Sequence, residues 1–486
     1  MTGRKLRLHL EGTGDGRFDA ILGGGIPALS VVVVAGAPGT GKTVLTLQLL
    51  FQAARDGKTC LYVTTLSEPA IKLIRYMQFF DFFDADLLDR RIVLADIGAA
   101  VRESPERTAT ELSRLIQQHE PNVVAIDSFK AVADLMPDAR AARGFTYELA
   151  TQTATWGATA FLLGEYGPDE SVARAEFAVA DGVIQLSSER RELTSLRELE
   201  VHKLRGMAYV SGRHFFDIDH RGFRVYPRVK SPDAEDAGTP AAPMGRVSTG
   251  VAGLDTLLGG GVPRLSSTVV EGATGTGKTL LSLQFLVAGA KKGERGALFT
   301  LEETPDQLRT VAASLGWDLA ALEKKNLLSI CYSSPVELST DRFLQTARDH
   351  VEKEHVSRAV FDSLTSMSLS VPSERRFKEL VYAMGKHLRA CGVTLLSTIE
   401  ADQLFGTPQV TGRGVSFIAD NLIRLRYVEK AGRLDRGIAV LKARGVKHST
   451  DLRAFTIDRG GLRLGNKAAR SAGALPGRRR SDRRQR

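Results

Sequence analysis

Two glycine-rich segments of this chain have the residue types and spacing G-x-x-x-x-G-K-[ST] of a phosphate-binding loop. The first consists of Gly36, Ala37, Pro38, Gly39, Thr40, Gly41, Lys42 and Thr43. The second consists of Gly272, Ala273, Thr274, Gly275, Thr276, Gly277, Lys278 and Thr279. In such a loop, backbone N–H groups surround the phosphates, the lysine reaches the β- and γ-phosphate oxygens, and the Ser/Thr hydroxyl binds Mg²⁺. We therefore predict two sites for ATP and Mg²⁺, and a catalytic role for Lys278.

A carboxylate ends a later apolar run in each half of the chain. Asp127 follows the residues VVAI, and Asp362 follows AVF. An aspartate at a strand end can support the metal ion of a bound nucleotide, or it can cap the next helix. Because both aspartates stand at matching distances from a phosphate-binding loop, we predict that they hold Mg²⁺ together with Thr43 and Thr279.

Two consecutive glutamates, Glu302 and Glu303, end what we predict to be the strand next to the second phosphate-binding strand. A carboxylate there can orient or deprotonate the group that attacks the γ-phosphate; the alternative is a solvated acidic turn. In the first half, Leu66 and Ser67 occupy the two acidic positions, and Glu68 stands one residue later. We therefore predict that Glu302 and Glu303 are catalytic and that the two sites are not equivalent.

A pair of basic residues with one residue between them occurs late in each half. The pairs are Lys203 with Arg205, and Lys442 with Arg444. Basic side chains can neutralise the charge that develops on the γ-phosphate, often from a neighbouring subunit. The alternative is a basic face of a β-strand. We predict that both pairs contact nucleotide, and that Lys442 and Arg444 take part in catalysis.

The spacing of these landmarks indicates a tandem duplication. The interval from Lys42 to Lys278 and the interval from Asp127 to Asp362 differ by a single position. Two landmarks at nearly one offset indicate a repeated domain and not a shared local motif. We expect a first domain over residues 1–230, a proline-containing linker over 231–245, a second domain over 246–465 and a disordered basic tail over 466–486.

Strand-like and helix-like segments alternate in both halves. In the first half, strands are expected at Leu29–Ala35, Cys60–Thr65, Arg91–Asp96, Asn122–Asp127 and Thr159–Leu163. In the second, they are expected at Leu298–Leu301, Leu327–Cys331, Ala359–Asp362 and Thr394–Thr398. This alternation predicts an α/β fold in which each domain is a doubly wound, mostly parallel sheet that ends in a hairpin. Ligands of such sheets bind at the carboxyl ends of the strands.

The composition is that of an ordinary water-soluble protein, with 43% hydrophobic and 25% charged residues. The apolar runs are too short to span a membrane, so we predict a cytoplasmic protein. The net charge is +10, but the last ten residues hold six arginines and one aspartate, a net charge of +5. Nucleic-acid contact is therefore expected only weakly, through this tail. Cys60, Cys331 and Cys391 have no metal-ligand spacing and are predicted to be reduced thiols.

The motifs of the second half, GATGTGKT, TLEETP, FDS and KxRG, resemble those of the KaiC family of circadian clock ATPases and autokinases. The resemblance covers nearly all of both domains, and the duplication is its most specific feature. It implies two RecA-like domains, a ring that is usually a hexamer, ATP bound between subunits in both tiers, and phosphorylation by the second tier of hydroxyl groups on the adjacent subunit.

One segment departs from the family pattern. The family carries adjacent phosphorylated Ser and Thr residues after its fifth strand; here Ser416 matches the Ser, and Phe417 replaces the Thr. Thr411 matches a nearby Thr. An aromatic ring cannot accept phosphate, so we predict at most one dominant phosphorylated residue, Ser416. The alternative is that Ser416 is a plain loop serine. The tail also differs from that of clock proteins, so no circadian role is assumed.

We therefore predict a ring-forming Mg²⁺-ATPase with Ser/Thr autokinase activity in its second domain and a structural or slow ATP site in its first. One alternative is a RecA/RadA-type DNA-handling ATPase, although the chain has no CxxC pair and no helix-hairpin-helix module. Another is a scaffold whose nucleotide state controls the binding of an unidentified signalling protein. The scaffold and the predicted ATPase need the same pockets, so the sequence does not separate these two.

Overall fold

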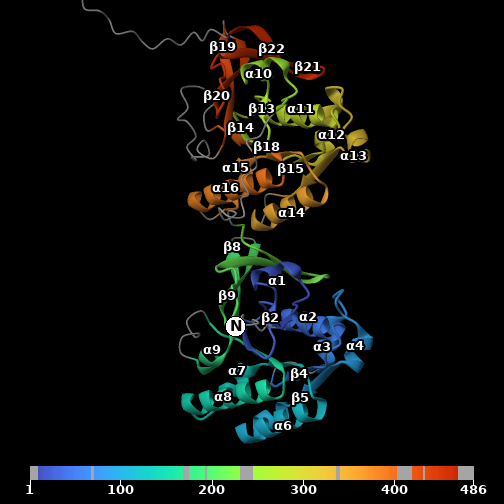
Figure 1. Ribbon diagram of the computed structural model, residues 1–486, viewed down its shortest axis with the longest axis vertical. Coiled ribbons are helices and arrows are strands. Elements are labelled where there is room, and N and C mark those ends of the chain that lie inside the picture. Colours follow the sequence, from blue (N-terminus) through green and yellow to red (C-terminus); the bar gives the residue numbers. More distant parts are fainter. Residues whose placement is uncertain are drawn as a thin grey trace, which may run out of the picture. The chain divides into compact units, whose positions relative to one another are not determined.

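The computed structural model describes residues 9–66, 70–167, 174–191, 194–229, 245–334, 340–371, 373–401, 419–430 and 433–468. The chain divides into two compact units, Met1–Arg228 and Val229–Arg486 (Figure 1). Most of the predicted linker and basic tail lie outside the described residues, as do Glu68, Thr411 and Ser416.

The first unit is built on a nine-stranded sheet, counted over the described residues. Its strands are β3 (Val31–Gly36), β4 (Cys60–Thr64), β5 (Ile92–Asp96), β6 (Val123–Asp127), β7 (Thr159–Gly164), β8 (Gly182–Arg191), β9 (Thr194–Leu204), β10 (Arg213–Asp219) and β11 (Gly222–Tyr226). They lie in the order β11-β10-β9-β8-β3-β7-β6-β4-β5. The six strands from β8 to β5 are parallel, and β9, β10 and β11 extend the sheet in antiparallel fashion. A short antiparallel pair, β1 (Leu10–Glu11) and β2 (Ile26–Pro27), comes before the sheet.

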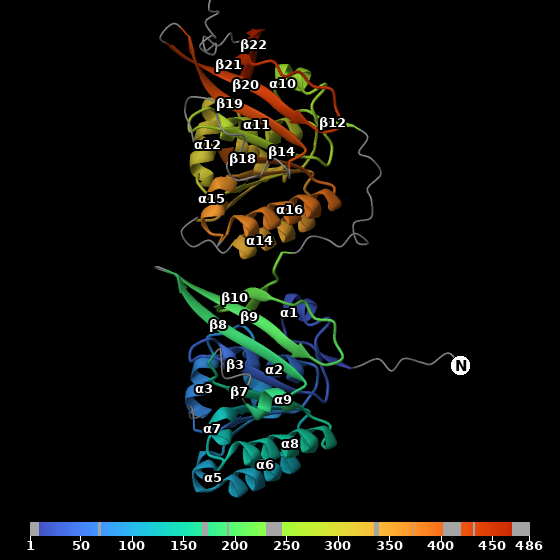
Figure 2. The ribbon, with the colours of Figure 1, turned by 90° about the vertical axis from the view of Figure 1, so that its left-hand side faces the viewer.

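Helices cover both faces of this sheet (Figures 1 and 2). One face packs against α1 (Gly16–Ile21), α2 (Lys42–Arg55), α3 (Ala70–Met77) and α4 (Ala85–Arg90). The other packs against α5 (Gly98–Glu103), α6 (Pro105–His119), α7 (Phe129–Ala133), α8 (Ala139–Thr155) and α9 (Ala175–Val179). The sheet is therefore the middle layer of a three-layer α/β/α unit.

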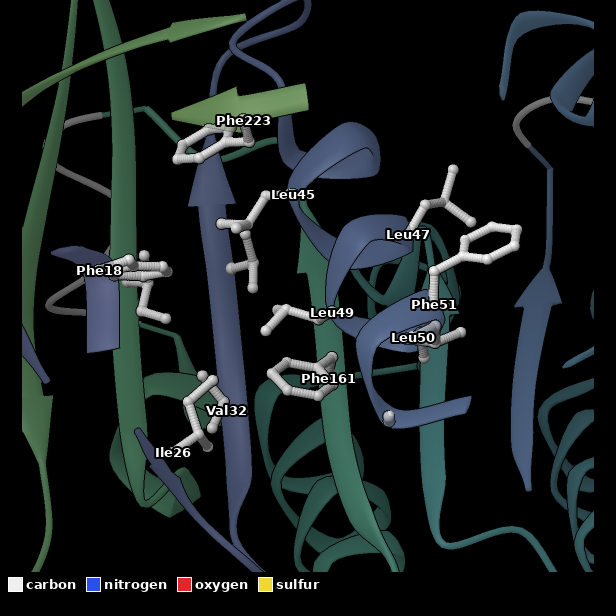
Figure 3. Close-up of a cluster of buried hydrophobic side chains, with 14 of the residues drawn as sticks. Phe18, Ile26, Val32, Leu45, Leu47, Leu49, Leu50, Phe51, Phe161 and Phe223 are labelled. Atoms are coloured by element: carbon white, nitrogen blue, oxygen red, sulfur yellow. The ribbon is translucent and has the colours of Figure 1, made fainter. Parts of the chain in front are cut away.

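The core around the first glycine-rich loop explains why α2 stays in place. Figure 3 shows Leu45, Leu49 and Leu50 of α2 in one cluster with Val32 of β3 and Phe161 of β7. These leucines and Val32 are nearly inaccessible to solvent. Each buried side chain of this kind contributes about 1.5–3 kcal/mol relative to its exposed state. The helix that begins at the loop is thus anchored by its apolar face to the strand that precedes the loop.

The second unit repeats this architecture. Its strands are β14 (Ser267–Gly272), β15 (Gly296–Thr300), β16 (Leu328–Tyr332), β17 (Arg358–Asp362), β18 (Thr394–Glu400), β19 (Asn421–Lys430), β20 (Arg433–Ala443), β21 (Arg453–Asp458) and β22 (Gly461–Ala468). They lie in the order β16-β15-β17-β18-β14-β19-β20-β21-β22. This is the order of the first sheet read from its other edge, from β5 to β11. The short pair β12 (Arg246–Val247) and β13 (Val262–Pro263) again comes first.

The helices of the second unit also form two layers. One face packs against α10 (Ala252–Leu257), α11 (Lys278–Ala290), α12 (Pro305–Ser314) and α13 (Leu319–Lys324). The other packs against α14 (Thr340–Lys353), α15 (Leu364–Leu369) and α16 (Glu374–Ala390). The predicted fold class, two tandem α/β domains with a hairpin at the end of each parallel sheet, is confirmed.

One prediction about strand order is wrong. The strand that leads to Glu302 and Glu303, β15, is not next to the phosphate-binding strand β14, because β17 and β18 lie between them. The neighbours of β14 are β18 and β19. Sequence order does not determine sheet order in a doubly wound sheet, where crossover helices let a strand return at a distance. In addition, β22 runs to Ala468, beyond the expected domain end at residue 465.

Candidate functional site

Each glycine-rich loop connects a central parallel strand to the helix behind it. Gly41 and Gly277, which stand directly before α2 and α11, have φ angles of 100° and 106°. A Cβ atom at Gly41 would lie 2.4 Å from Cδ1 of Ile218, in addition to the backbone strain. Only glycine fits there, and the first N–H groups of the helix remain directed toward the loop. Both segments therefore have the geometry of a phosphate-binding loop.

The two loop lysines adopt the same arrangement. Lys42 Nζ donates hydrogen bonds to the carbonyl oxygens of Gly36 at 2.9 Å and Ala37 at 3.1 Å. Lys278 Nζ donates to those of Gly272 at 2.8 Å and Ala273 at 3.1 Å. Burial lowers the pKa of both lysines, and nearby carboxylates oppose that shift. The lysines are thus held over their loops.

In the second domain, the strand-end aspartate lies beside the loop threonine. Asp362 is buried, and it accepts hydrogen bonds from Thr279 and from Oγ1 of Thr398. Burial raises the pKa of Asp362; the two threonine hydroxyls and Lys278 oppose that shift. Hydroxyl and carboxylate oxygens are the ligands that Mg²⁺ prefers. Thr279 and Asp362 therefore fit the predicted magnesium site.

The two glutamates of the second domain differ in their surroundings. Glu302 Oε1 accepts hydrogen bonds from Ser363 Oγ at 2.6 Å and from Ser366 Oγ at 2.5 Å. Glu303 Oε2 is buried and has no hydrogen-bond partner among the described residues. Burial raises the pKa of Glu303, and the charges of Asp362 and Glu302 raise it further. Glu303 is therefore the stronger candidate for a base, while Glu302 is held by the two serines.

In the first domain, a tyrosine contacts the strand-end aspartate. Asp127 Oδ2 accepts hydrogen bonds from Thr43 Oγ1 at 3.0 Å and from the hydroxyl of Tyr62 at 2.6 Å. The sheet registers place Tyr62 of β4 where the second domain has Leu298 of β15, and Leu163 where it has Thr398. Besides the loop threonine, a second hydroxyl donates to each aspartate. It comes from the strand on one side, β4, in the first domain and from the strand on the other side, β18, in the second.

A cavity of about 440 Å³ opens beside the first phosphate-binding loop. Its polar lining includes Lys42, Thr43, Tyr62, Asp127 and Glu165, and apolar residues of α2, α3 and β10 complete it. The cavity therefore joins the predicted lysine and metal ligands of the first site. Leu66, at the position of Glu302, is exposed, and Glu68 lies outside the described residues.

Sequence reasoning missed one acidic residue in each site. Glu165 follows β7, and its counterpart Glu400 ends β18. Their charges act on Lys42 and Lys278, and the hydroxyl of Thr274 donates a hydrogen bond to Glu400 Oε1. The offset between these two glutamates is the signal that could have identified them, because it equals the offset between Asp127 and Asp362.

The basic pairs do not lie beside the phosphate-binding loops of their own domains. Arg205 N donates to Asp181 O, and Asp181 N donates to Val31 O, so Arg205 is level with the first residue of β3. The loop begins at Gly36, about 16 Å along the strand at 3.3 Å per residue. Lys203 Nζ contacts Ala178 O at 3.2 Å, at the same end of the sheet.

The second pair repeats this placement. Arg444 N donates to Asp420 O, Asp420 N donates to Ser267 O, and Lys442 Nζ donates to Ala419 O at 2.6 Å. Burial lowers the pKa of Lys442, and the neighbouring charge of Arg444 lowers it further. Neither pair is brought to the lysine of its own loop.

Comparison with known proteins decides the family. The family model described as "ATPase: KaiC" matches residues 12–230 and, a second time, residues 247–469. The chain belongs to the KaiC family of ATPases. It is 30% identical over 470 residues to the circadian clock oscillator protein KaiC of Rippkaea orientalis, covering 94% of this chain and 88% of that protein. It is 30% identical over 465 residues to the protein of that name from Synechococcus elongatus (93% and 87%). It is 29% identical over 487 residues to the circadian clock protein KaiC3 of Synechocystis (96% and 93%).

Each KaiC match includes one complete phosphate-binding loop with its strand-end aspartate, so both halves of the chain are KaiC ATPase domains. The predicted resemblance to the KaiC family is confirmed. Among the described residues, no helix has the length and apolar character needed to cross a membrane.

Proposed function

We propose that this KaiC-family ATPase completes its ATP sites between subunits of a ring, and that its second domain is the main site of hydrolysis. One observation supports the shared sites most strongly: Arg205 and Arg444 are level with the first residues of β3 and β14, whereas the loops follow the last residues of these strands. The distance along each strand between the arginine and the loop exceeds the length of an arginine side chain. These residues cannot reach the phosphates at the loop of their own domain, and a neighbouring copy of the chain can supply the loop that they contact.

The arrangement around Glu303 supports hydrolysis in the second domain. Its buried and unpaired carboxylate oxygen, with a raised pKa, is suited to take a proton from the attacking group. Lys278 holds the phosphates, and Thr279 and Asp362 hold Mg²⁺, which neutralises phosphate charge when bound. The first domain has Leu66 and Ser67 at the positions of Glu302 and Glu303, so it lacks the proposed base at this place. We infer that the first site binds ATP mainly to hold the ring together.

We further propose that the second domain phosphorylates Ser416 on the neighbouring subunit. Ser416 is three positions before Ala419, whose carbonyl oxygen accepts the hydrogen bond from Lys442. The predicted acceptor is thus near, in the chain, to the basic pair that we assign to the neighbour's nucleotide. An acceptor held in line with the γ-phosphate needs little more than positioning and charge neutralisation.

Mixed rings test the shared site. One variant carries Lys278→Ala, which removes the loop lysine and leaves the basic pair. The other carries Lys442→Ala with Arg444→Ala, which leaves the loop intact. We expect each alone to have little second-site turnover. In an equal mixture, about a quarter of the second sites join an intact loop to an intact pair, if subunits mix at random.

Phosphate release from the mixture should therefore exceed the average of the two variants measured separately. The control mixes Lys278→Ala with a variant that carries all three substitutions, because no complete second site forms in that mixture. Release from the test mixture that equals the average would show that the basic pair acts within its own subunit or not at all.

A further inference from the structure

Two helices of the second domain bring together three side chains that commonly bind metals. α14 and α16 lie side by side on one face of the sheet (Figures 1 and 2) and pack through Phe343, Leu344 and Leu380. Beyond these apolar residues, Glu352 near the end of α14 faces His387 near the end of α16. Cys391, the residue that caps α16, is one helical turn after His387.

The three ligand atoms are already close to one another. Glu352 Oε1 is 3.1 Å from His387 Nε2, and Cys391 Sγ is 3.4 Å from the same nitrogen. All three atoms lie within 4.8 Å of one another. In a tetrahedral zinc site with bonds of about 2.0–2.3 Å, ligand atoms are separated by about 3.3–3.7 Å. The cluster therefore needs only small side-chain shifts to surround one ion.

The charges around the cluster suit a metal that prefers sulfur and nitrogen ligands. Burial lowers the pKa of His387 and the charge of Arg348 lowers it further, whereas the contact with Glu352 opposes that shift. With a thiolate and a carboxylate as ligands, a divalent cation leaves the centre neutral beside Arg348.

We propose that Glu352, His387 and Cys391 form a Zn²⁺ site, in which a water molecule is the fourth ligand. On binding, the S–H bond of Cys391 breaks, an S–Zn bond forms, and the proton passes to the buffer. Mg²⁺ does not compete, because it prefers oxygen ligands in octahedral geometry.

This site is separate from the nucleotide site of the same domain. Cys391 comes just before β18, which begins at Thr394, whereas Thr398 and Glu400, at the other end of β18, face Asp362 and the phosphate-binding loop. Bound zinc would fasten the ends of α14 and α16 to each other and thereby stabilise that face of the second domain.

Cobalt is the probe that distinguishes this site from the two nucleotide sites. Co²⁺ bound through a thiolate gives a sulfur-to-metal charge-transfer band in the near ultraviolet, whereas Co²⁺ bound only by oxygen atoms does not. We expect the metal-stripped full chain at micromolar concentration to show this band with one equivalent of Co²⁺. Zn²⁺ should remove the band, because it binds a tetrahedral thiolate site more tightly.

Cys391→Ser and His387→Ala should abolish the band. The matched control is Cys331→Ser, since Cys331 belongs to no such cluster among the described residues. Zn²⁺ should also raise the melting temperature of the wild-type chain but not that of Cys391→Ser. Absence of the band from the wild-type chain, or its persistence in Cys391→Ser, would overturn the proposal. Cys391 is exposed, so we expect its replacement by serine to leave the fold intact.

Discussion

The hydroxyl of Tyr62 lies 2.6 Å from Oδ2 of Asp127, the oxygen that also accepts a hydrogen bond from Thr43. The second domain has Leu298 at the corresponding position, and there Thr398 donates to Asp362 from the neighbouring strand on the other side. The predicted metal-holding carboxylates of the two sites are thus oriented by different hydroxyls. The two sites therefore differ in the hydroxyl that contacts the aspartate and in the residue at the position of Glu302, which is Leu66 in the first domain.

The contact between Tyr62 and Asp127 should weaken Mg²⁺ binding in the first site. The hydroxyl competes with a metal-bound water for the same carboxylate oxygen, and Tyr62→Phe removes it without changing the ring. In a Lys278→Ala background, where the first site accounts for the turnover, we expect the half-saturating Mg²⁺ concentration to fall on the order of fivefold, the equivalent of about one hydrogen bond. Phosphate release measured across a Mg²⁺ titration checks this.

Tyr76→Phe provides the control for that experiment, because Tyr76 lines the same cavity. It should leave the Mg²⁺ requirement unchanged. A higher Mg²⁺ requirement in Tyr62→Phe would mean that the tyrosine hydroxyl instead positions Asp127 for the metal.

Glu303 should determine the acid side of the pH–rate profile of the second site. Because burial and the charges of Asp362 and Glu302 raise its pKa, Glu303 is protonated, and loses its function as a base, at a higher pH than an ordinary glutamate. Glu303→Gln should lower turnover by about 100-fold or more.

Glu302→Gln should have a smaller effect, because glutamine can still accept the hydrogen bonds of Ser363 and Ser366. Removing the charge of Glu302 also lowers the pKa of Glu303, so the remaining activity should persist to lower pH than in the wild type. Phosphate release measured over a series of pH values on the acid side of neutrality follows both effects. An acid limb that stays in place in Glu302→Gln would contradict the assignment of Glu303 as the base.

Incubation with ATP and Mg²⁺ should phosphorylate Ser416 and no second residue to a comparable extent. Phe417 removes the adjacent acceptor that the family pattern provides, and Thr411 is the next candidate in the sequence. Mass spectrometry of the incubated chain identifies the residue, with Glu303→Gln as the variant in which labelling should be lost. If Ser416 stays unmodified while phosphate is released freely, the protein is an ATPase without autokinase activity.

The loops, aspartates and domain repeat could be predicted because each is encoded in a short stretch of sequence. Gly41 and Lys42 are neighbours in the chain, and the strand and helix that flank them adjoin the loop directly. The position of β15 could not be predicted, since the order of strands in a sheet depends on where each crossover helix packs. Nothing in the sequence distinguishes Tyr62 from any other strand residue. Its contact with Asp127 results from the parallel register of β4 and β6.

The cluster around Cys391 illustrates a second limit of predicting sites from sequence. The spacing of Cys391 from His387 is that of one helical turn, which a sequence pattern can indicate. Glu352, however, belongs to an earlier helix and joins them only through the packing of α14 against α16. The spacing of the three cysteines alone therefore does not indicate this cluster, because its groups come from two different helices.

The placement of each basic pair at the far end of the phosphate-binding strand has a consequence for how activity responds to protein abundance. If the basic pairs act as proposed, each domain carries both halves of a catalytic centre but does not bring its own two halves together. On the proposed assignment, specific activity therefore rises with the concentration of the chain itself and levels off once rings are closed. Dilution would then lower the specific activity without any inhibitor, and a higher concentration of the protein in the cell would raise it.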